Sequence, residues 1–217
     1  MNRVETVSEA LGTRIRTERQ QAGLTVRGLA GRVGVSPSLI SQIERGRATP
    51  SVATLWSVAD ALGVSIAELF NGAEPEPLER EPTARGPVQP QETRRVITLA
   101  DGIRWERLTP LSDDELDFVL VVYPPGAASC PADALTRHGG REFGYVVSGT
   151  LAVEVGFDEH VLRMNDSIAF DSSMPHRLRA VGDEPAVAVW AVLHRHGDDR
   201  DRNFEAASDN SAGASIT

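Results

Sequence analysis

Hydrophobic residues recur at helical spacing over the first seventy residues. Leu11, Ile15 and Arg19 share one face of a helix, and Gly23 suits the position just after its end. Further helices are predicted where a Ser or Thr can cap the N-terminus and a glycine or a turn follows the last apolar position. These four segments begin after Thr25, Ser36, Ser51 and Ser65 and cover residues 26–33, 37–45, 52–62 and 66–70.

Between residues 95 and 196 the apolar residues instead form short segments, separated at regular intervals by Gly, Pro, Asn and Asp. Such spacing favours an all-β sandwich or barrel. The predicted strands cover residues 96–99, 104–108, 117–123, 141–147, 150–157, 161–164, 167–170, 176–181 and 186–194.

Polar stretches divide the chain into domains. Five prolines interleaved with Glu and Arg fall between residues 73 and 94, which predicts a semi-extended linker. Residues 197–217 are polar and rich in small residues, and we expect a disordered tail there. With a flexible N-terminus over residues 1–9, the helical domain spans 10–72 and the β-domain spans 95–196.

Composition narrows the cellular setting. No apolar run approaches the roughly 18 residues of a membrane span, and the first residues lack the layout of a signal peptide. Cys130 is the only cysteine, so no intrachain disulfide can form. These features indicate a cytoplasmic protein without a membrane partner. The chain has no lysine, which excludes Schiff-base chemistry by its own side chains.

The net charge of −9 at first argues against nucleic acid as a partner. However, residues 1–72 hold eight Arg and six acidic residues, a net +2, and the rest of the chain carries −11. A DNA-binding head on an acidic body fits this distribution.

The second and third predicted helices are joined by a short turn that contains Gly34, which is typical of a helix-turn-helix. On the third helix, Leu39, Ile40 and Ile43 are expected to face the core. The opposite face presents Ser38, Ser41 and Gln42, which are polar and uncharged, as base readout in the major groove requires. The alternative is a helical bundle that serves only dimerisation.

The stretch from Leu24 to Phe70, with Ser-Pro-Ser-Leu-Ile-Ser-Gln-Ile-Glu-Arg-Gly at residues 36–46, resembles the lambda-repressor-like (XRE) family. The resemblance implies a double-stranded DNA operator and a homodimer that reads two half-sites about 34 Å apart. It also implies an internal salt bridge between Arg19 and Glu44. The expected DNA contacts are Thr25, Arg27, Arg45 and Arg47 to phosphates and Ser36, Ser38, Ser41 and Gln42 to bases.

Residues 136–149 resemble the first motif of the cupin family, and residues 165–176 resemble the second. His138, Glu142 and Gly149 match the first motif, and His176 matches the histidine of the second. Three positions depart from the pattern: Thr136 replaces the first histidine, Asn165 a glycine and Ala180 an asparagine. The whole chain then looks like an XRE regulator with a C-terminal cupin. The expected fold is α+β and multidomain: a five-helix helix-turn-helix bundle, a linker and an all-β cupin (jelly-roll) barrel.

His138, Glu142 and His176 form a candidate site for a divalent metal such as Fe, Zn, Ni or Mn, because two imidazoles and one carboxylate suit these ions. The same groups could instead bind an organic effector without a metal. Three aromatic residues are weaker candidates for the effector pocket: Tyr123, Phe170 and Trp190. Three other histidines lack ligand spacing and are expected at the surface: His160, His194 and His196.

Two functions fit these motifs. The first is a transcriptional regulator whose cupin domain binds a small-molecule effector, which changes operator affinity. The alternative is an iron-dependent oxygenase or epoxidase, since phosphonate-modifying enzymes of this architecture use a similar His, Glu and His set. Those enzymes also use a lysine, which this chain lacks, and the intact third helix favours the regulator.

Overall fold

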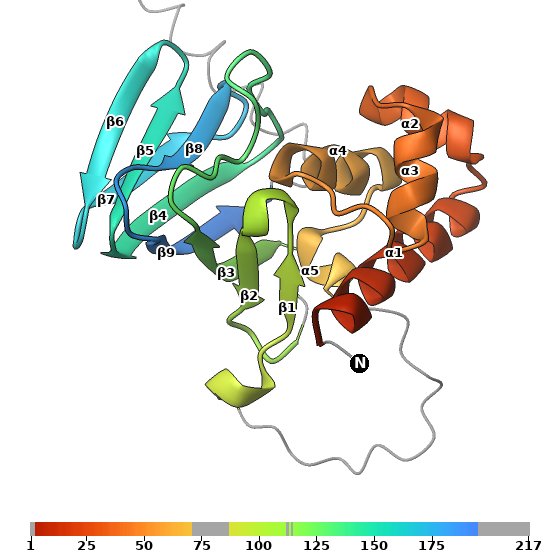
Figure 1. Cartoon of the computed structure of the whole chain (residues 1–217), viewed down its shortest axis with the longest axis horizontal. Helices are drawn as coiled ribbons and strands as arrows, with labels where there is room; N and C mark the ends of the chain where they lie inside the picture. Colours follow the sequence, from red (N-terminus) through yellow and green to blue (C-terminus); the bar gives the residue numbers. More distant parts are fainter. Residues whose placement is uncertain (1–2, 71–86, 112, 114, 195–217) are drawn as a thin grey trace, which may run out of the picture.

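The structure is a computed structural model that describes residues 3–70, 87–111, 113 and 115–194 (Figure 1). Most of the predicted linker, the predicted tail and His196 lie outside these residues. Five helices form one unit, in chain order α1 (Arg3–Gln21), α2 (Val26–Val33), α3 (Pro37–Glu44), α4 (Val52–Leu62) and α5 (Ile66–Leu69).

The predicted caps start four of these helices. The hydroxyl of Thr25 accepts a hydrogen bond from Gly28 N at 3.0 Å, and that of Ser36 accepts one from Leu39 N at 3.2 Å. Ser51 caps α4 in the same way, and Ser65 forms a capping box with Glu68 at α5. These local bonds explain why the helix boundaries could be predicted to within a residue or two.

Two boundaries differ from the sequence prediction. α1 begins at Arg3, within the segment that was expected to be flexible, because residues 3–9 contain neither Gly nor Pro and the helix continues through them. Within the predicted linker, a single 3₁₀ turn, η1 (Gln91–Thr93), follows Pro90. A proline is compatible with the position just before such a turn, although within the interior of a helix it would break the helix.

The nine strands confirm the all-β prediction for the second half and build two sheets. One sheet has six strands in the order β1-β2-β3-β9-β4-β7, and the other has three in the order β6-β5-β8. A second 3₁₀ turn, η2 (Ala100–Gly102), separates β1 from β2. The strand bounds are β1 (Val96–Thr98), β2 (Arg104–Arg107), β3 (Leu116–Tyr123), β4 (Arg141–Ser148), β5 (Thr150–Val155), β6 (Asp158–Arg163), β7 (Ser167–Asp171), β8 (His176–Ala180) and β9 (Ala186–Leu193).

Asn165 shows how the second motif tolerates the loss of its glycine. Its backbone has φ +73°, in the left-handed region that Asn adopts more readily than most residues. Its side-chain oxygen also accepts a hydrogen bond from Tyr145 Oη at 2.8 Å. The turn between β6 and β7 is therefore preserved.

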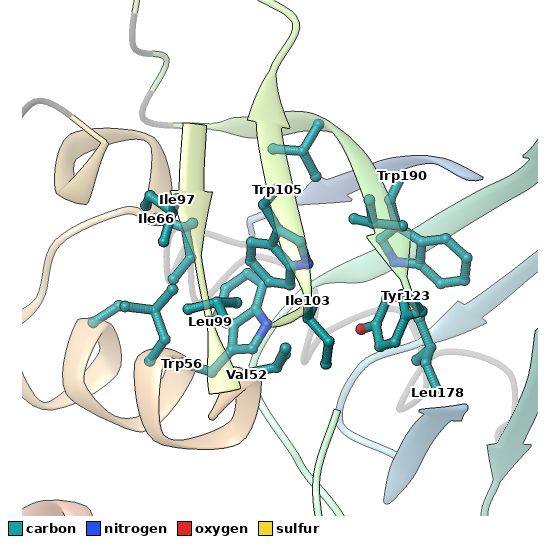
Figure 2. Packing of buried hydrophobic residues seen from close by; sticks show 14 of the residues in the cluster. Val52, Trp56, Ile66, Ile97, Leu99, Ile103, Trp105, Tyr123, Leu178 and Trp190 are labelled. Atoms are coloured by element: carbon teal, nitrogen blue, oxygen red, sulfur yellow. The ribbon is translucent and has the colours of Figure 1, made fainter. Parts of the chain in front are cut away.

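The helical unit and the barrel share one hydrophobic core. In Figure 2, Trp56 and Ile66 of the helices lie beside Ile97, Leu99 and Trp105 of the barrel. Two backbone hydrogen bonds also cross the boundary, from Ala53 N to Ser129 O (3.2 Å) and from Ala100 N to Pro50 O (2.9 Å). Figure 1 shows α4 and α5 beside the strands and α2 on the far side of the helical unit.

Candidate functional site

The third helix presents the residues expected to read DNA, with one difference. Ser38 and Gln42 are exposed, and their side chains are linked by a 3.4 Å hydrogen bond from Gln42 Nε2 to Ser38 Oγ. Ser41 is half-buried, and Ser36 is exposed while its hydroxyl caps α3. Ile40 and Ile43 are fully buried beneath this face.

The residues expected to contact phosphates differ in exposure from the expected salt bridge. Thr25, Arg27, Arg45 and Arg47 are exposed, as phosphate contacts must be. Arg19 is buried and pairs with Glu44 through its guanidinium, with Nη2 2.9 Å from Oε2.

Arg19 also donates to Leu24 O at 2.7 Å, so its guanidinium joins the end of α1 to α3. Burial opposes its charge, but the Glu44 carboxylate outweighs this and raises the pKa of Arg19. Both side chains are thereby committed to the interior, and neither is available to DNA.

In the β-domain, His138, Glu142 and His176 bring their ligand atoms within 4.8 Å of one another. Glu142 lies on β4 and His176 begins β8, so one carboxylate and one imidazole come from different sheets. Glu142 Oε1 is 2.9 Å from His138 Nε2 and 3.1 Å from His176 Nε2. All three side chains are nearly buried, with at most 5% of each exposed.

Backbone carbonyls set the orientation of both rings. His176 Nδ1 lies 2.9 Å from Met174 O, and His138 Nδ1 lies 3.3 Å from Gly139 O. An Nδ1–H that donates to a carbonyl leaves Nε2 with its lone pair, which is the tautomer that binds a metal. In that tautomer both Nε2 lone pairs would be available to an ion bound beside Glu142.

The carboxylate of Glu142 is held from its other side. Trp190 Nε1 donates to Glu142 Oε2 at 2.7 Å, which leaves Oε1 for the two histidines. Burial opposes ionisation of Glu142, but interactions with His138 and His176 outweigh it and hold the pKa of Glu142 well below its usual range. For His176, burial lowers the pKa, and the neighbouring carboxylate raises it by more.

These residues fit a divalent ion. His138 Nε2 and Glu142 Oε1 are close, yet neither makes a hydrogen bond of acceptable geometry with any described residue. Adjacent ligands about 2.1 Å from an octahedral ion lie roughly 3.0 Å apart, which matches both measured separations. The three ligand atoms are therefore close enough together to share one ion.

Thr136 occupies the position of the missing first histidine. It forms a two-way backbone bridge with His176, with N–O distances of 3.0 and 2.9 Å. Its side chain is buried, and Oγ1 has no hydrogen-bond partner within the described part of the chain. A hydroxyl replaces an imidazole here, so the site offers three protein ligands and space beside them.

A small cavity lies next to this site. Tyr123 and Trp190 line it, whereas Phe170 packs against His176, with ring centroids 5.2 Å apart, and is not part of the lining. Burial raises the pKa of Tyr123 above its ordinary value, so its hydroxyl remains neutral. The full lining is Val52, Trp56, Trp105, Asp117, Val119, Val121, Tyr123, Ser129, Thr136, Glu142, His176, Leu178, Trp190 and Val192.

Sequence analysis missed the residues that the helical unit contributes to this cavity. Val52 and Trp56 come from α4, and the indole of Trp56 stacks on the His138 ring with centroids 4.0 Å apart and an angle of 11° between planes. An apolar residue within a helix predicts only core packing, and nothing in the local pattern indicates that the core in question includes a barrel.

One histidine is not where it was expected. His194 is largely buried, with 19% of its side chain exposed, and Nε2 lies 2.7 Å from Asp117 Oδ2. The other carboxylate oxygen of Asp117 accepts a hydrogen bond from Ala67 N of α5 at 2.7 Å. His194 was predicted at the surface because its spacing in the sequence gives no sign of a contact with Asp117, 77 residues earlier, on the strand β3 that pairs with β9. His160 is exposed, as predicted.

Comparisons with known proteins agree with this architecture. A family model described as helix-turn-helix matches residues 15–69, and one described as cupin domain matches residues 119–192. No helix among the described residues is long and apolar enough to span a membrane.

Several curated relatives share the architecture or its helical part. The HTH-type transcriptional regulator SutR of Escherichia coli is 27% identical over 191 residues, which cover 88% of this chain and 98% of SutR. PuuR of Escherichia coli is 27% identical over 175 residues, with 77% and 85% covered. YazB of Bacillus subtilis, an uncharacterized HTH-type transcriptional regulator, is 42% identical over 62 residues, with 29% and 90% covered.

Among solved structures, an HTH_3 family transcriptional regulator from Vibrio cholerae superimposes with a TM-score of 0.66 at 23% identity, covering 88% of this chain and 99% of that one. This likeness shows the same fold. Together with the matched models and the curated relatives, it places the chain in a family. The protein belongs to the XRE-type helix-turn-helix transcriptional regulators and carries a C-terminal cupin domain.

Proposed function

We propose that this regulator binds its operator as a homodimer and that a small molecule at a metal-bearing cupin site changes its operator affinity. The observation that carries the proposal is the buried cluster of His138, Glu142 and His176, whose ligand atoms all lie within 4.8 Å of one another. A site with three protein ligands leaves positions for an exogenous ligand. A bound metal would act as a Lewis acid that holds an oxygen or nitrogen atom of the effector.

The residues that line the adjacent cavity favour a compact and largely apolar effector. Valines, Leu178 and three indoles provide most of the lining, and no arginine belongs to it. The hydroxyls of Tyr123, Ser129 and Thr136 add a few polar points that would orient such a ligand. Recognition of a strongly anionic ligand would therefore depend on the metal.

The half of the molecule that would bind DNA supports a dimer that reads bases in the major groove. Gln42 and Ser38 are exposed on α3, and Arg45 and Arg47 follow them at the surface. One such head reads few base pairs, so two copies on two half-sites provide specificity. In a cell, such a protein would work in the cytoplasm, where the DNA is.

The metal is tested on protein purified without added metal. We expect about one equivalent of a divalent metal in the wild type and loss of it in His138→Ala. His160→Ala is the matched control, because His160 is exposed and lies outside the site. Equal metal content in wild type and His138→Ala would contradict the site, and no metal in any sample would favour an organic ligand held by the same groups.

The DNA half is tested with duplexes selected from a random library by the full-length protein. Binding to the selected operator is then measured by fluorescence anisotropy for metal-loaded protein and for protein treated with a chelator. We expect a several-fold to about hundredfold difference in affinity between the two states. Identical affinities would overturn regulation through this site.

The geometry of the same three ligands favours one second candidate, an iron-dependent oxygenase, because two histidines and a carboxylate bind Fe(II) in such enzymes. Oxygen uptake by the Fe(II)-loaded protein with a hydroxyalkylphosphonate separates the two functions. Turnover that is abolished in Glu142→Gln would establish the enzyme, and no uptake would leave the regulator.

A further inference from the structure

The ligand cavity is built by both domains, and its helical wall is part of the unit that reads DNA. α4 supplies Val52 and Trp56, which are 4% and 8% exposed, to a lining that otherwise comes from the barrel. The same helix packs against α2 of the helix-turn-helix, and its Leu55 and Val58 are fully buried. A ligand in this cavity therefore touches the DNA-binding unit itself.

One contact links the candidate metal centre to that helix. The rings of Trp56 and His138 are nearly parallel at 4.0 Å, whereas His138 meets His176 edge-on at 5.1 Å. Trp56 also lies 6.2 Å from Trp105 and 6.0 Å from His194, in tilted arrangements that surround it with rings from the barrel. Because close-packed interiors do not deform continuously, a change in the His138 ring must be met by a shift of Trp56.

Asp117 provides another contact between the helical unit and the barrel, in addition to that of Trp56. Asp117 holds Ala67 N of α5 and also lines the cavity, while His194 bridges toward Trp56. Two of the contacts that join the helical unit to the barrel thus border the cavity. Movements of side chains in the cavity can therefore be passed to the helical unit through these contacts.

We propose that Trp56 is the residue that couples occupancy of the cupin site to the position of the DNA-reading unit. This inference rests on the proposed function and specifies how its regulation works. In a dimer, a tilt of each helical unit changes the spacing of the two α3 helices, and hence operator affinity. Reciprocity requires that operator DNA change metal affinity by the same factor.

The test measures this coupling factor for Co(II), the metal alone, with the full-length chain and its selected operator. Co(II) binding is followed by visible absorption with and without operator, and operator binding by anisotropy with and without Co(II). We compare the wild type, Trp56→Leu and the control Ser57→Ala, whose hydroxyl bonds to Ala53 O within its own helix at 2.9 Å. The coupling factor is the ratio of the affinities measured with and without the second ligand. A substitution that weakens Co(II) binding equally in free and DNA-bound protein therefore leaves the factor unchanged.

We expect a factor between about 5 and 100 in the wild type and in Ser57→Ala, and a factor below about 2 in Trp56→Leu. An undiminished factor in Trp56→Leu would overturn the role of Trp56 and leave regulation by the site intact. A factor of one in the wild type would overturn both proposals. If Trp56→Leu fails to unfold cooperatively, Trp56→Met replaces it, and a wild-type factor in that variant would also overturn the inference.

Discussion

Trp190 Nε1 donates a hydrogen bond of 2.7 Å to Glu142 Oε2, and this bond fixes which carboxylate oxygen faces the two histidines. Trp190 lies on β9, directly beside the β4 strand that carries Glu142. The indole would therefore orient a ligand without touching a bound ion. Such supporting contacts are typical of metal sites, because a free carboxylate rotates and loses its alignment.

Trp190→Phe removes this donor while keeping an aromatic ring in the core. We expect the affinity for Co(II) or Zn(II) to fall about 10- to 100-fold, since Glu142 is no longer held in place. Competition with a chelating indicator measures the change.

Trp105→Phe is the matched control for this prediction. Trp105 lines the same cavity and is equally buried, but its indole does not bond to Glu142. Its metal affinity should change much less than that of Trp190→Phe. Equal losses in the two variants would indicate general damage to the cavity and contradict the orienting role.

The helices and the close pair His138 and Glu142 were predictable because their signals are local. A Ser or Thr before each helix makes its bond within three residues, and His138 and Glu142 are four residues apart on adjoining segments. His176 came from a motif, since no periodicity links it to Glu142.

The seating of the helical unit on the barrel was not predictable for the opposite reason. Trp56 and His138 are far apart in the sequence, as are Ala67 and Asp117, and each looks ordinary within its own element. In the sequence, Trp56 fits the apolar face of a helix, and Asp117 fits the start of a strand. Only the packing of the two domains makes either residue part of a ligand cavity.

Asp117 provides a prediction about that seating. It is 2% exposed and accepts from Ala67 N while contacting His194, so Asp117→Ala leaves two buried polar groups without their partner. We expect the free energy of unfolding to fall by about 1 to 3 kcal/mol in urea titrations. Asp117→Asn should lower the free energy of unfolding by less, because the amide oxygen of Asn can still accept a hydrogen bond from Ala67 N. A larger loss in Asn than in Ala would contradict this explanation.

Two helical glycines predict opposite effects of the same substitution. A Cβ at Gly12 of α1 would lie 2.3 Å from Ile43 O, a backbone atom of α3 that cannot move aside alone. Gly12→Ala should therefore destabilise the protein by about 1 to 3 kcal/mol. A Cβ at Gly31 of α2 meets nothing within 4 Å, and Gly31→Ala should stabilise the helix by about 0.5 to 1 kcal/mol.

Urea unfolding of the full-length chain measures both glycine variants under the same conditions. The two free-energy changes should differ in sign. Stabilisation by Gly12→Ala would mean that α1 and α3 are farther apart in solution than in the structure, and would question the Arg19–Glu44 pair that joins them.

Gln42 and Arg47 allow base reading and phosphate binding to be told apart. Both are exposed near the end of α3, but only Gln42 carries the amide that can pair bidentately with adenine. Gln42→Ala should weaken binding to the selected operator by about 1 to 3 kcal/mol and relax preference at one base position in each half-site. Arg47→Gln should weaken all sequences nearly equally and reduce the slope of log affinity against log salt by about one per head. Anisotropy titrations on the operator and on single-base variants, at three salt concentrations, measure both effects. If Gln42→Ala weakens every sequence alike and Arg47→Gln relaxes the base preference, the orientation of α3 in the groove must differ from the one proposed.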